Sequence, residues 1–305
     1  MTVPADRFRG CILGLALGDA LGAPHEGGFA ERLLWRLIGK SRSGKMRWTD
    51  DTQMSLDQIE SLLAHGAVHQ DDLAKRFAAS YRWSRGYGPS TAKVLRRLAS
   101  GADWRWVNTS IHPAGSFGNG AAMRAPVLGL YFAHRSDGLD EAVRRASVVT
   151  HSHPHGVEGA ILIARATAAA ALGARSDVVF QSAASAAVSP QFVHRLQKAG
   201  EWLSSGREVS ASDVARELGN GMEATASCVT AVYLAARFLH ATLDDLIASV
   251  VSVGGDADTI GAMACAIWGA ARGDGDLPGD VLEQLEDRAR ISALAEALHR
   301  RVLEC

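Results

Sequence analysis

Two short acidic stretches, far apart in the chain, carry the side chains best suited to chemistry. The first is Trp48-Thr49-Asp50-Asp51-Thr52, and the second is Gly254-Gly255-Asp256-Ala257-Asp258-Thr259. Each places two carboxylates and a threonine hydroxyl where a loop is predicted to turn into a helix. Such oxygens are the hard ligands that magnesium, manganese or calcium prefer. Neither stretch could hold these ions alone, but together their four carboxylates could offset one or two dications.

A purely structural interpretation of these acids is that they cap helices, as polar residues at helix starts commonly do. Asp50, with Gln53 three residues later, has the spacing of a capping box. A helix start also repels cations, so a metal here must be held by the acids and not by the helix dipole. Two matching clusters at two helix starts, one preceded by paired glycines, favour the metal interpretation.

Three other stretches could contribute to such a site. Glu26 lies in a loop bounded by glycine and proline, where a lone glutamate is ordinarily solvated. Residues 115–124 place three glycines before a predicted helix, so their N–H groups could approach an anion, although a plain connecting loop has the same composition. His151, His153 and His155 alternate, but no nearby cysteine or carboxylate completes a zinc site. We expect at most His151 to touch a ligand.

The first predicted helix, residues 6–22, must pack unusually closely against something. Glycine at every fourth position leaves it with a row that has no side chains (Gly10, Gly14, Gly18 and Gly22). Each glycine costs roughly 0.5–1 kcal/mol relative to alanine, so close approach of another helix or a ligand must offset that cost. A predicted helix at 259–271 has a face of small residues that suits such packing.

The remaining segments are also predicted to be helices joined by loops. Trp104 and Trp106 are assigned to a loop, and the segment 173–221 to three short helices. No period-2 strand pattern and no repeat of fixed length occurs. The sequence therefore predicts an all-α fold with a single domain over residues 1–305. Other helices are expected at about 50–63, 70–82, 91–99, 139–149, 155–172, 223–239, 243–252, 279–288 and 291–303.

The composition narrows the class of protein. The chain has 305 residues, 47% of them hydrophobic and 21% charged, as in soluble globular proteins. A formal net charge of -1 gives no reason to expect general affinity for nucleic acid or an anionic membrane. No apolar run reaches membrane-spanning length, and Asp19 interrupts the one near the N-terminus, so no cleavable signal is predicted. Cys11, Cys228 and Cys265 lie in apolar patterns without CxxC spacing, which predicts reduced cysteines and a cytoplasmic location.

Taken in order, these stretches resemble the ADP-ribosylglycohydrolase family over nearly the whole chain. The paired acidic motifs are highly specific, while the glycine-rich and histidine stretches add support through their order. The resemblance implies an all-α fold with a binuclear magnesium or manganese centre in a cleft. The matching stretches are Gly18-Asp19-Ala20-Leu21-Gly22-Ala23 with Glu26, and residues 48–54, 118–124, 150–154 and 254–261.

The resemblance also implies roles for single residues. Asp258 would bridge two Mg²⁺ or Mn²⁺ ions, and Glu26 corresponds to a glutamate on a mobile loop over them. The implied catalytic carboxylates are Glu26, Asp51 and Asp258. The implied metal ligands are Thr49, Asp50, Asp51, Asp256, Asp258 and Thr259. The residues at the positions where the family binds the diphosphate and distal ribose are Ser116, Phe117, Gly118, Asn119 and His151, with Phe117 near the adenine.

The implied reaction is hydrolysis at the anomeric carbon of ADP-ribose, which frees a protein side chain such as arginine or serine. The partner is then an ADP-ribosylated protein or a small ADP-ribosyl compound, and the oligomeric state is left open. Two stretches depart from the family: residues 27–48 follow none of its patterns, and the loop 84–91 has no acid to favour an arginine leaving group. Arg124 is expected in the core near the site.

Two alternatives stay open. One is another metal-dependent hydrolase, acting on a ribosyl compound such as O-acetyl-ADP-ribose or on ADP-ribosylated nucleic acid. The other belongs to a different class, a binding or structural protein that keeps the ADP-ribose cleft without turnover. The intact acidic motifs and Glu26 favour an enzyme, since a non-catalytic relative would be free to lose them.

Overall fold

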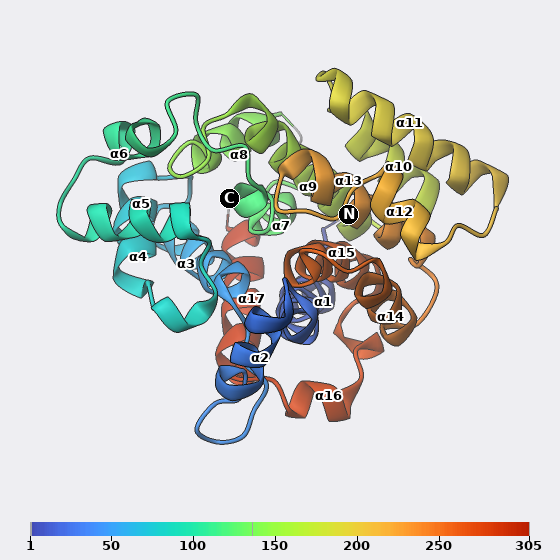
Figure 1. Cartoon of the computed structure of the whole chain (residues 1–305), viewed down its shortest axis with the longest axis horizontal. Helices are drawn as coiled ribbons and strands as arrows, with labels where there is room; N and C mark the ends of the chain where they lie inside the picture. The colour runs from blue at the N-terminus through green and yellow to red at the C-terminus, as the bar shows by residue number, and fades with distance from the viewer. Residues whose placement is uncertain (1, 136, 305) are drawn as a thin grey trace.

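The computed structural model describes residues 2–135 and 137–304, and nearly all of its regular structure is helical (Figure 1). Within those residues no sheet forms, and strand-like pairing is limited to three isolated bridges. The predicted all-α class is confirmed. The helices are α1 (Ala5–Gly22), α2 (Phe29–Ile38), α3 (Asp50–His65), α4 (Gln70–Ser80), α5 (Pro89–Ala99), α6 (Trp104–Ile111), α7 (Ala125–Tyr131), α8 (Leu139–Ser147), α9 (Pro154–Ala171), α10 (Ser176–Ala184), α11 (Pro190–Ser205), α12 (Ala211–Glu217), α13 (Ala224–Arg237), α14 (Leu243–Val253), α15 (Ala257–Arg272), α16 (Gly279–Glu283) and α17 (Arg288–Leu303).

The glycine row of α1 packs directly against α15, as predicted. The two helices lie side by side near the centre of the molecule, with α4–α6 to one side and α10–α12 to the other (Figure 1). A methyl group added at Gly14 would lie 2.5 Å from the carbonyl oxygen of Cys265, and one at Gly22 would lie 2.6 Å from the Cα atom of Asp258. This backbone-to-backbone contact fixes the acidic start of α15 beside the end of α1.

One connected core surrounds this central pair. Its buried apolar residues extend from Val3 to Leu298. Cys11, Cys228 and Cys265 are buried and free. Among the described residues, no helix combines the length and the apolar character needed to cross a membrane.

The structure corrects three details of the predicted helices. Trp104 and Trp106 lie in α6 and not in a loop, because the Asp103 carboxylate accepts a hydrogen bond from the N–H of Arg105 (2.9 Å) and caps a helix there. α11 has 16 residues, so the segment 173–221 does not consist only of short helices. The capping box from Asp50 to Gln53 is also absent: Thr49 is the N-cap of α3, and Gln53 donates to Asp57 instead.

Candidate metal centre and substrate cleft

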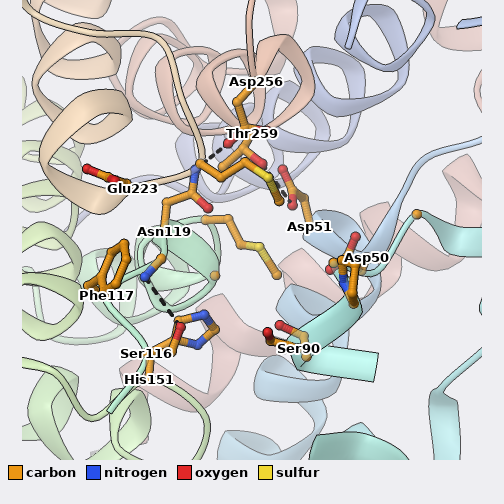
Figure 2. A pocket seen from close by; sticks show the side chains of 18 of the residues that line it. Asp50, Asp51, Ser90, Ser116, Phe117, Asn119, His151, Glu223, Asp256 and Thr259 are labelled. Carbon is orange, nitrogen blue, oxygen red and sulfur yellow. Dashed lines mark hydrogen bonds between the residues drawn. The ribbon is translucent and has the colours of Figure 1, made fainter. Parts of the chain in front are cut away.

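A cavity of about 320 Å³ brings the predicted site residues together from distant segments (Figure 2). Its volume falls in the range of pockets that hold small-molecule ligands. Thr49 is the one predicted site residue that does not line it. The predicted residues that do are Glu26, Asp50, Asp51, Ser116, Phe117, Gly118, Asn119, His151, Asp256, Asp258 and Thr259.

The two acidic helix starts meet in this cavity. The Thr259 hydroxyl lies 3.4 Å from the Asp51 Oδ1 atom, which joins the start of α15 to the start of α3. Carboxylate oxygens of Glu26, Asp256 and Asp258 lie within 4.8 Å of one another. Glu26 reaches this cluster because the N–H of the next residue, Gly27, donates to the Gly255 carbonyl (3.4 Å). The convergence expected from the sequence therefore occurs.

The start of α3 is held by Asp19, a fully buried carboxylate of α1. Its oxygens accept hydrogen bonds from the N–H of Thr49 (2.8 and 2.9 Å), from the N–H of Thr52 (3.1 Å) and from the Thr52 hydroxyl (2.5 Å). These N–H groups begin a helix and have no intrahelical partner. Asp19 was not predicted to act in the site, although an acid within the apolar, glycine-rich α1 was the available signal.

The start of α15 is held by amides from two other segments. Gly254 and Gly255 have φ angles of 67° and 77°, the region that favours glycine, and turn the chain into α15. The N–H of Asp256 donates to the Asn220 carbonyl (2.8 Å), and the Asn220 side chain donates to Val253 O (2.9 Å). Asn119 Nδ2 donates to Asp256 Oδ2 (2.5 Å), so this predicted diphosphate contact orients a carboxylate of the cluster (Figure 2).

The carboxylates at the two helix starts (Asp50, Asp51, Asp256 and Asp258), which together with Glu26 form the acidic cluster, lie in an environment that disfavours negative charge. Burial, followed by repulsion from neighbouring carboxylates, raises the pKa of Asp50, Asp51 and Asp258 well above the ordinary value. Burial raises the pKa of Asp256 as well, although the Asn119 hydrogen bond opposes the increase. The Asp51 Oδ2 atom is buried without a hydrogen-bond partner.

These features fit divalent metal ions. A buried carboxylate oxygen without a partner costs free energy unless a cation or a donor reaches it. The other donors are carboxylate and hydroxyl oxygens, which suit Mg²⁺ or Mn²⁺. Asp50, Asp51, Asp256, Asp258 and Thr259 could hold such ions, with Glu26 beside them.

His151 presents a neutral imidazole to the cavity. Burial, and then the nearby positive charge of Arg124, lower its pKa to about 3. The Thr150 hydroxyl accepts a hydrogen bond from Arg124 (2.9 Å) and lies 2.8 Å from His151 Nδ1. Because that hydroxyl proton needs an acceptor, it is directed to Nδ1, which leaves the proton of the ring on Nε2. Gly118 and Gly120 have no side chains to cover the ring, so Nε2 can donate to a ligand. Arg124 itself is buried, as expected.

Several cavity residues were not predicted from the sequence. Met222 and Glu223 lie at the same end as Phe117, joined to it by hydrogen bonds from Asn119 N to Met222 O and from Ala224 N to Phe117 O (both 3.0 Å). Toward the other end, Ser90 lies on the Asp50 side of the view in Figure 2, and its hydroxyl lies 3.0 Å from the Nε2 atom of His112. No spacing in the sequence connects these residues to the acidic motifs.

The sequence profile of the ADP-ribosylglycohydrolase family matches residues 1–304. This chain belongs to the ADP-ribosylglycohydrolase family. It is 31% identical to the ADP-ribosylhydrolase ARH3 of Gallus gallus over 344 aligned residues, which cover 97% of this chain and 93% of that protein. It is 28% identical to the ADP-ribosyl-(dinitrogen reductase) glycohydrolase of Rhodospirillum rubrum, over 94% of this chain and 93% of that protein.

A solved structure supports the same assignment. The structure titled "ADP-ribosylglycohydrolase-related protein complex" is 28% identical in sequence, covers 98% of each chain and has a TM-score of 0.70. Membership of the ADP-ribosylglycohydrolase family makes this chain a glycosyl hydrolase.

Proposed function

We propose that this ADP-ribosylglycohydrolase uses two Mg²⁺ or Mn²⁺ ions to remove ADP-ribose from a modified acceptor. The bond cleaved is the one at the anomeric carbon of the proximal ribose. The observation that carries the proposal is the meeting of two acid pairs, linked from Thr259 to Asp51, around a buried Asp51 oxygen without a partner. We also infer that residues 1–305 form one domain, because the family match extends over residues 1–304 and one core runs through the described part of the chain.

The carboxylates of the cluster perform two tasks in the proposed reaction. Departure of the acceptor builds positive charge on the ribose ring, and fixed negative groups in a buried cleft stabilise that charge. A carboxylate of Glu26, Asp51 or Asp258 accepts a proton of the attacking water, and the departing acceptor atom takes up a proton as its bond to the anomeric carbon breaks. Bound divalent ions would supply Lewis-acid polarisation and a water of lowered pKa.

The rest of the cleft positions the substrate. His151 Nε2 and the backbone around Gly118 offer hydrogen-bond donors suited to the diphosphate and distal ribose. Phe117, which is 47% exposed, offers a ring face for the base. Accurate positioning of reacting groups can contribute on the order of 7–11 kcal/mol in the best cases.

The loop beyond Asp50 favours an acceptor without positive charge. Its cavity-lining residues (Gly86, Gly88, Pro89, Ser90 and Thr91) include no acid. A guanidinium leaving group would gain from a carboxylate there, whereas a hydroxyl leaving group would not need one. We therefore propose a hydroxyl-linked acceptor, such as a modified serine, ahead of modified arginine.

Release of ADP-ribose from a modified protein tests the reaction. Asp51→Asn and Asp258→Asn should each lower turnover by about 10³-fold or more, because each removes a charge that the ions and the developing cation need. Asp244→Asn is a matched control, since Asp244 is an exposed acid in the first turn of α14 and does not line the cavity. Chelation should abolish turnover of the unaltered protein, and Mg²⁺ or Mn²⁺ should restore it.

The same assay separates the alternatives. Faster release from serine-linked than from arginine-linked ADP-ribose would support the proposed acceptor, and faster release from O-acetyl-ADP-ribose would support a small-molecule substrate. Binding of ADP-ribose with no release from any of these substrates would indicate a non-catalytic relative. Undiminished turnover in the variant that lacks both carboxylates would exclude the metal-dependent reaction.

A further inference from the structure

The end of the cavity formed by Phe117, Met222 and Glu223 has properties that the metal-dependent reaction does not explain. Among the large apolar side chains that the described residues expose, only Phe117 (47%) and Met222 (55%) line the cavity. In Figure 2, Phe117 and Glu223 lie together at the end opposite Asp50 and Ser90. Exposed apolar groups inside a cleft mark a place where a flat apolar ligand can be covered.

The backbone at this end is fixed, so its side chains have defined positions. Gly118 and Glu223 form an isolated antiparallel bridge, secured by the two hydrogen bonds between residues 117–119 and 222–224. Glu223 is also the N-cap of α13, where its carbonyl accepts hydrogen bonds from Ala226 N (2.8 Å) and Ser227 N (3.1 Å). The Phe117 ring packs edge-on against His153, with a centroid distance of 5.9 Å.

The Glu223 carboxylate is available to a ligand. It lines the cavity, and its side chain has no hydrogen bond or ion pair with any other described residue. It accepts hydrogen bonds and, when ionised, cannot donate them. The group it suits is therefore an N–H donor at the edge of a flat ring whose faces contact Phe117 and Met222.

We propose that Glu223 recognises the base that the proposed function places at this end of the cavity, by accepting a hydrogen bond from an exocyclic amino group of that base. This proposal rests on the proposed function, which places an ADP-ribosyl group in the cleft. Adenine then lies against Phe117 and Met222, and its 6-amino group faces Glu223. Glu223 is a specificity-determining residue, distant from the reacting bond, and it selects an amino-purine over a purine that lacks the amino group.

Calorimetric binding of two ligands in the presence of Mg²⁺ tests the proposal: ADP-ribose, and its analogue with hydrogen in place of the 6-amino group. The unaltered protein should bind ADP-ribose about ten-fold more tightly, the size expected for one hydrogen bond to a charged group at an open site. Glu223→Ala should bind both ligands equally, because the discriminating acceptor is gone. Glu208→Ala is a matched control, since Glu208 is exposed and does not line the cavity, and it should keep the ten-fold preference.

The outcomes distinguish this proposal from the proposed function. Equal binding of both ligands by the unaltered protein, or a preference that survives in Glu223→Ala, would overturn the role of Glu223 while leaving hydrolysis intact. Base discrimination without any release of ADP-ribose would leave the base site standing and remove the proposed function. Loss of arginine-linked turnover in Glu223→Ala, with no change in base preference, would show that Glu223 contacts the acceptor and would also overturn the proposal.

Discussion

The starts of α3 and α15 carry similar acidic motifs, but the protein holds them by different means. At the start of α3, the buried charge of Asp19 accepts hydrogen bonds from Thr49 and Thr52. At the start of α15, neutral groups do this: the Asn220 carbonyl and the Asn119 side chain hold Asp256, and the Asn220 side chain holds Val253. The α3 acids are therefore positioned by the helix packed at the centre of the molecule, and the α15 acids by loops that also line the cleft.

This difference separates the two halves of the proposed metal centre: the α3 half is held from the core, and the α15 half is held from loops of the cleft. Asp19 and the glycine row both belong to α1, so the α3 start and the α1–α15 contact are fixed together in the core. Asn119 links Asp256 to the loop that carries Phe117, the residue expected at the base. We therefore expect substrate bound against this loop to affect Asp256 more directly than it affects the α3 carboxylates.

The largest predicted effect is on the melting temperature of the protein when a chelator removes metal from both halves of the proposed centre. The raised pKa values of Asp50, Asp51 and Asp258 mean that the folded chain binds more protons than the unfolded chain above the ordinary carboxyl pKa. The stability that protonation provides is present at low pH and is lost as pH rises. In chelator, the melting temperature should fall by about 10 °C between pH 5 and pH 8.

The metal-bound protein provides the contrast for this measurement. Mg²⁺ or Mn²⁺ at pH 8 should raise the melting temperature, because an ion that binds only the folded state stabilises it. The variant with both Asp51→Asn and Asp258→Asn should show a flatter pH dependence in chelator, since two of the repelling charges are gone. A melting temperature in chelator that rises with pH up to pH 8 would contradict the electrostatic account of the cluster.

The next prediction compares how much the Asp19 and Asn220 hydrogen bonds each contribute to the free energy of unfolding. Asp19→Ala leaves two buried N–H groups and the Thr52 hydroxyl without their acceptor, and should lower the free energy of unfolding by about 3 kcal/mol. Asn220→Ala removes one side-chain hydrogen bond, to Val253 O, and should cost about 1 kcal/mol. Urea denaturation at pH 7.5 measures both, and a larger loss for Asn220→Ala would show that the α3 half is not the more firmly held.

The sequence identified the two acidic stretches because carboxylate-threonine motifs are local, and it identified the α1–α15 contact because a glycine row is visible by its spacing. The role of Asp19 in the site was not predicted. Its partners are N–H groups at the start of α3, and the sequence does not show that this helix start lies beside α1. Glu223 was also missed, because only the pairing of residues 117–119 with 222–224 brings it into the cleft. The loop assignment at Trp104 is wrong because it overlooks a local signal: Asp103 is a residue type that caps helices, and it caps α6.

A smaller effect concerns metal affinity and not stability. Asn119→Ala removes the donor that orients Asp256, and should weaken Mn²⁺ binding by about ten-fold, as loss of a group that supports a metal ligand commonly does. Ser227→Ala removes the other partner of Asn119, a hydroxyl 3.0 Å from Nδ2, and should change the affinity less. Calorimetric titration with Mn²⁺ measures both, and equal effects would place the support of Asp256 elsewhere.

The smallest effect distinguishes the two threonines. The Thr259 hydroxyl lines the cleft and lies near Asp51, whereas the Thr49 hydroxyl accepts a hydrogen bond from Asp51 N (3.4 Å) within its own helix start. Thr259→Ala should therefore weaken Mn²⁺ binding several-fold more than Thr49→Ala, which should mainly lower stability by about 0.5–1 kcal/mol through loss of the cap. Thr259→Ser and Thr49→Ser keep the hydroxyl and should restore most of each loss. If Thr49→Ala weakens Mn²⁺ binding as much as Thr259→Ala does, Thr49 is a ligand as the family resemblance implies, and the two helix starts contribute equally to the metal centre.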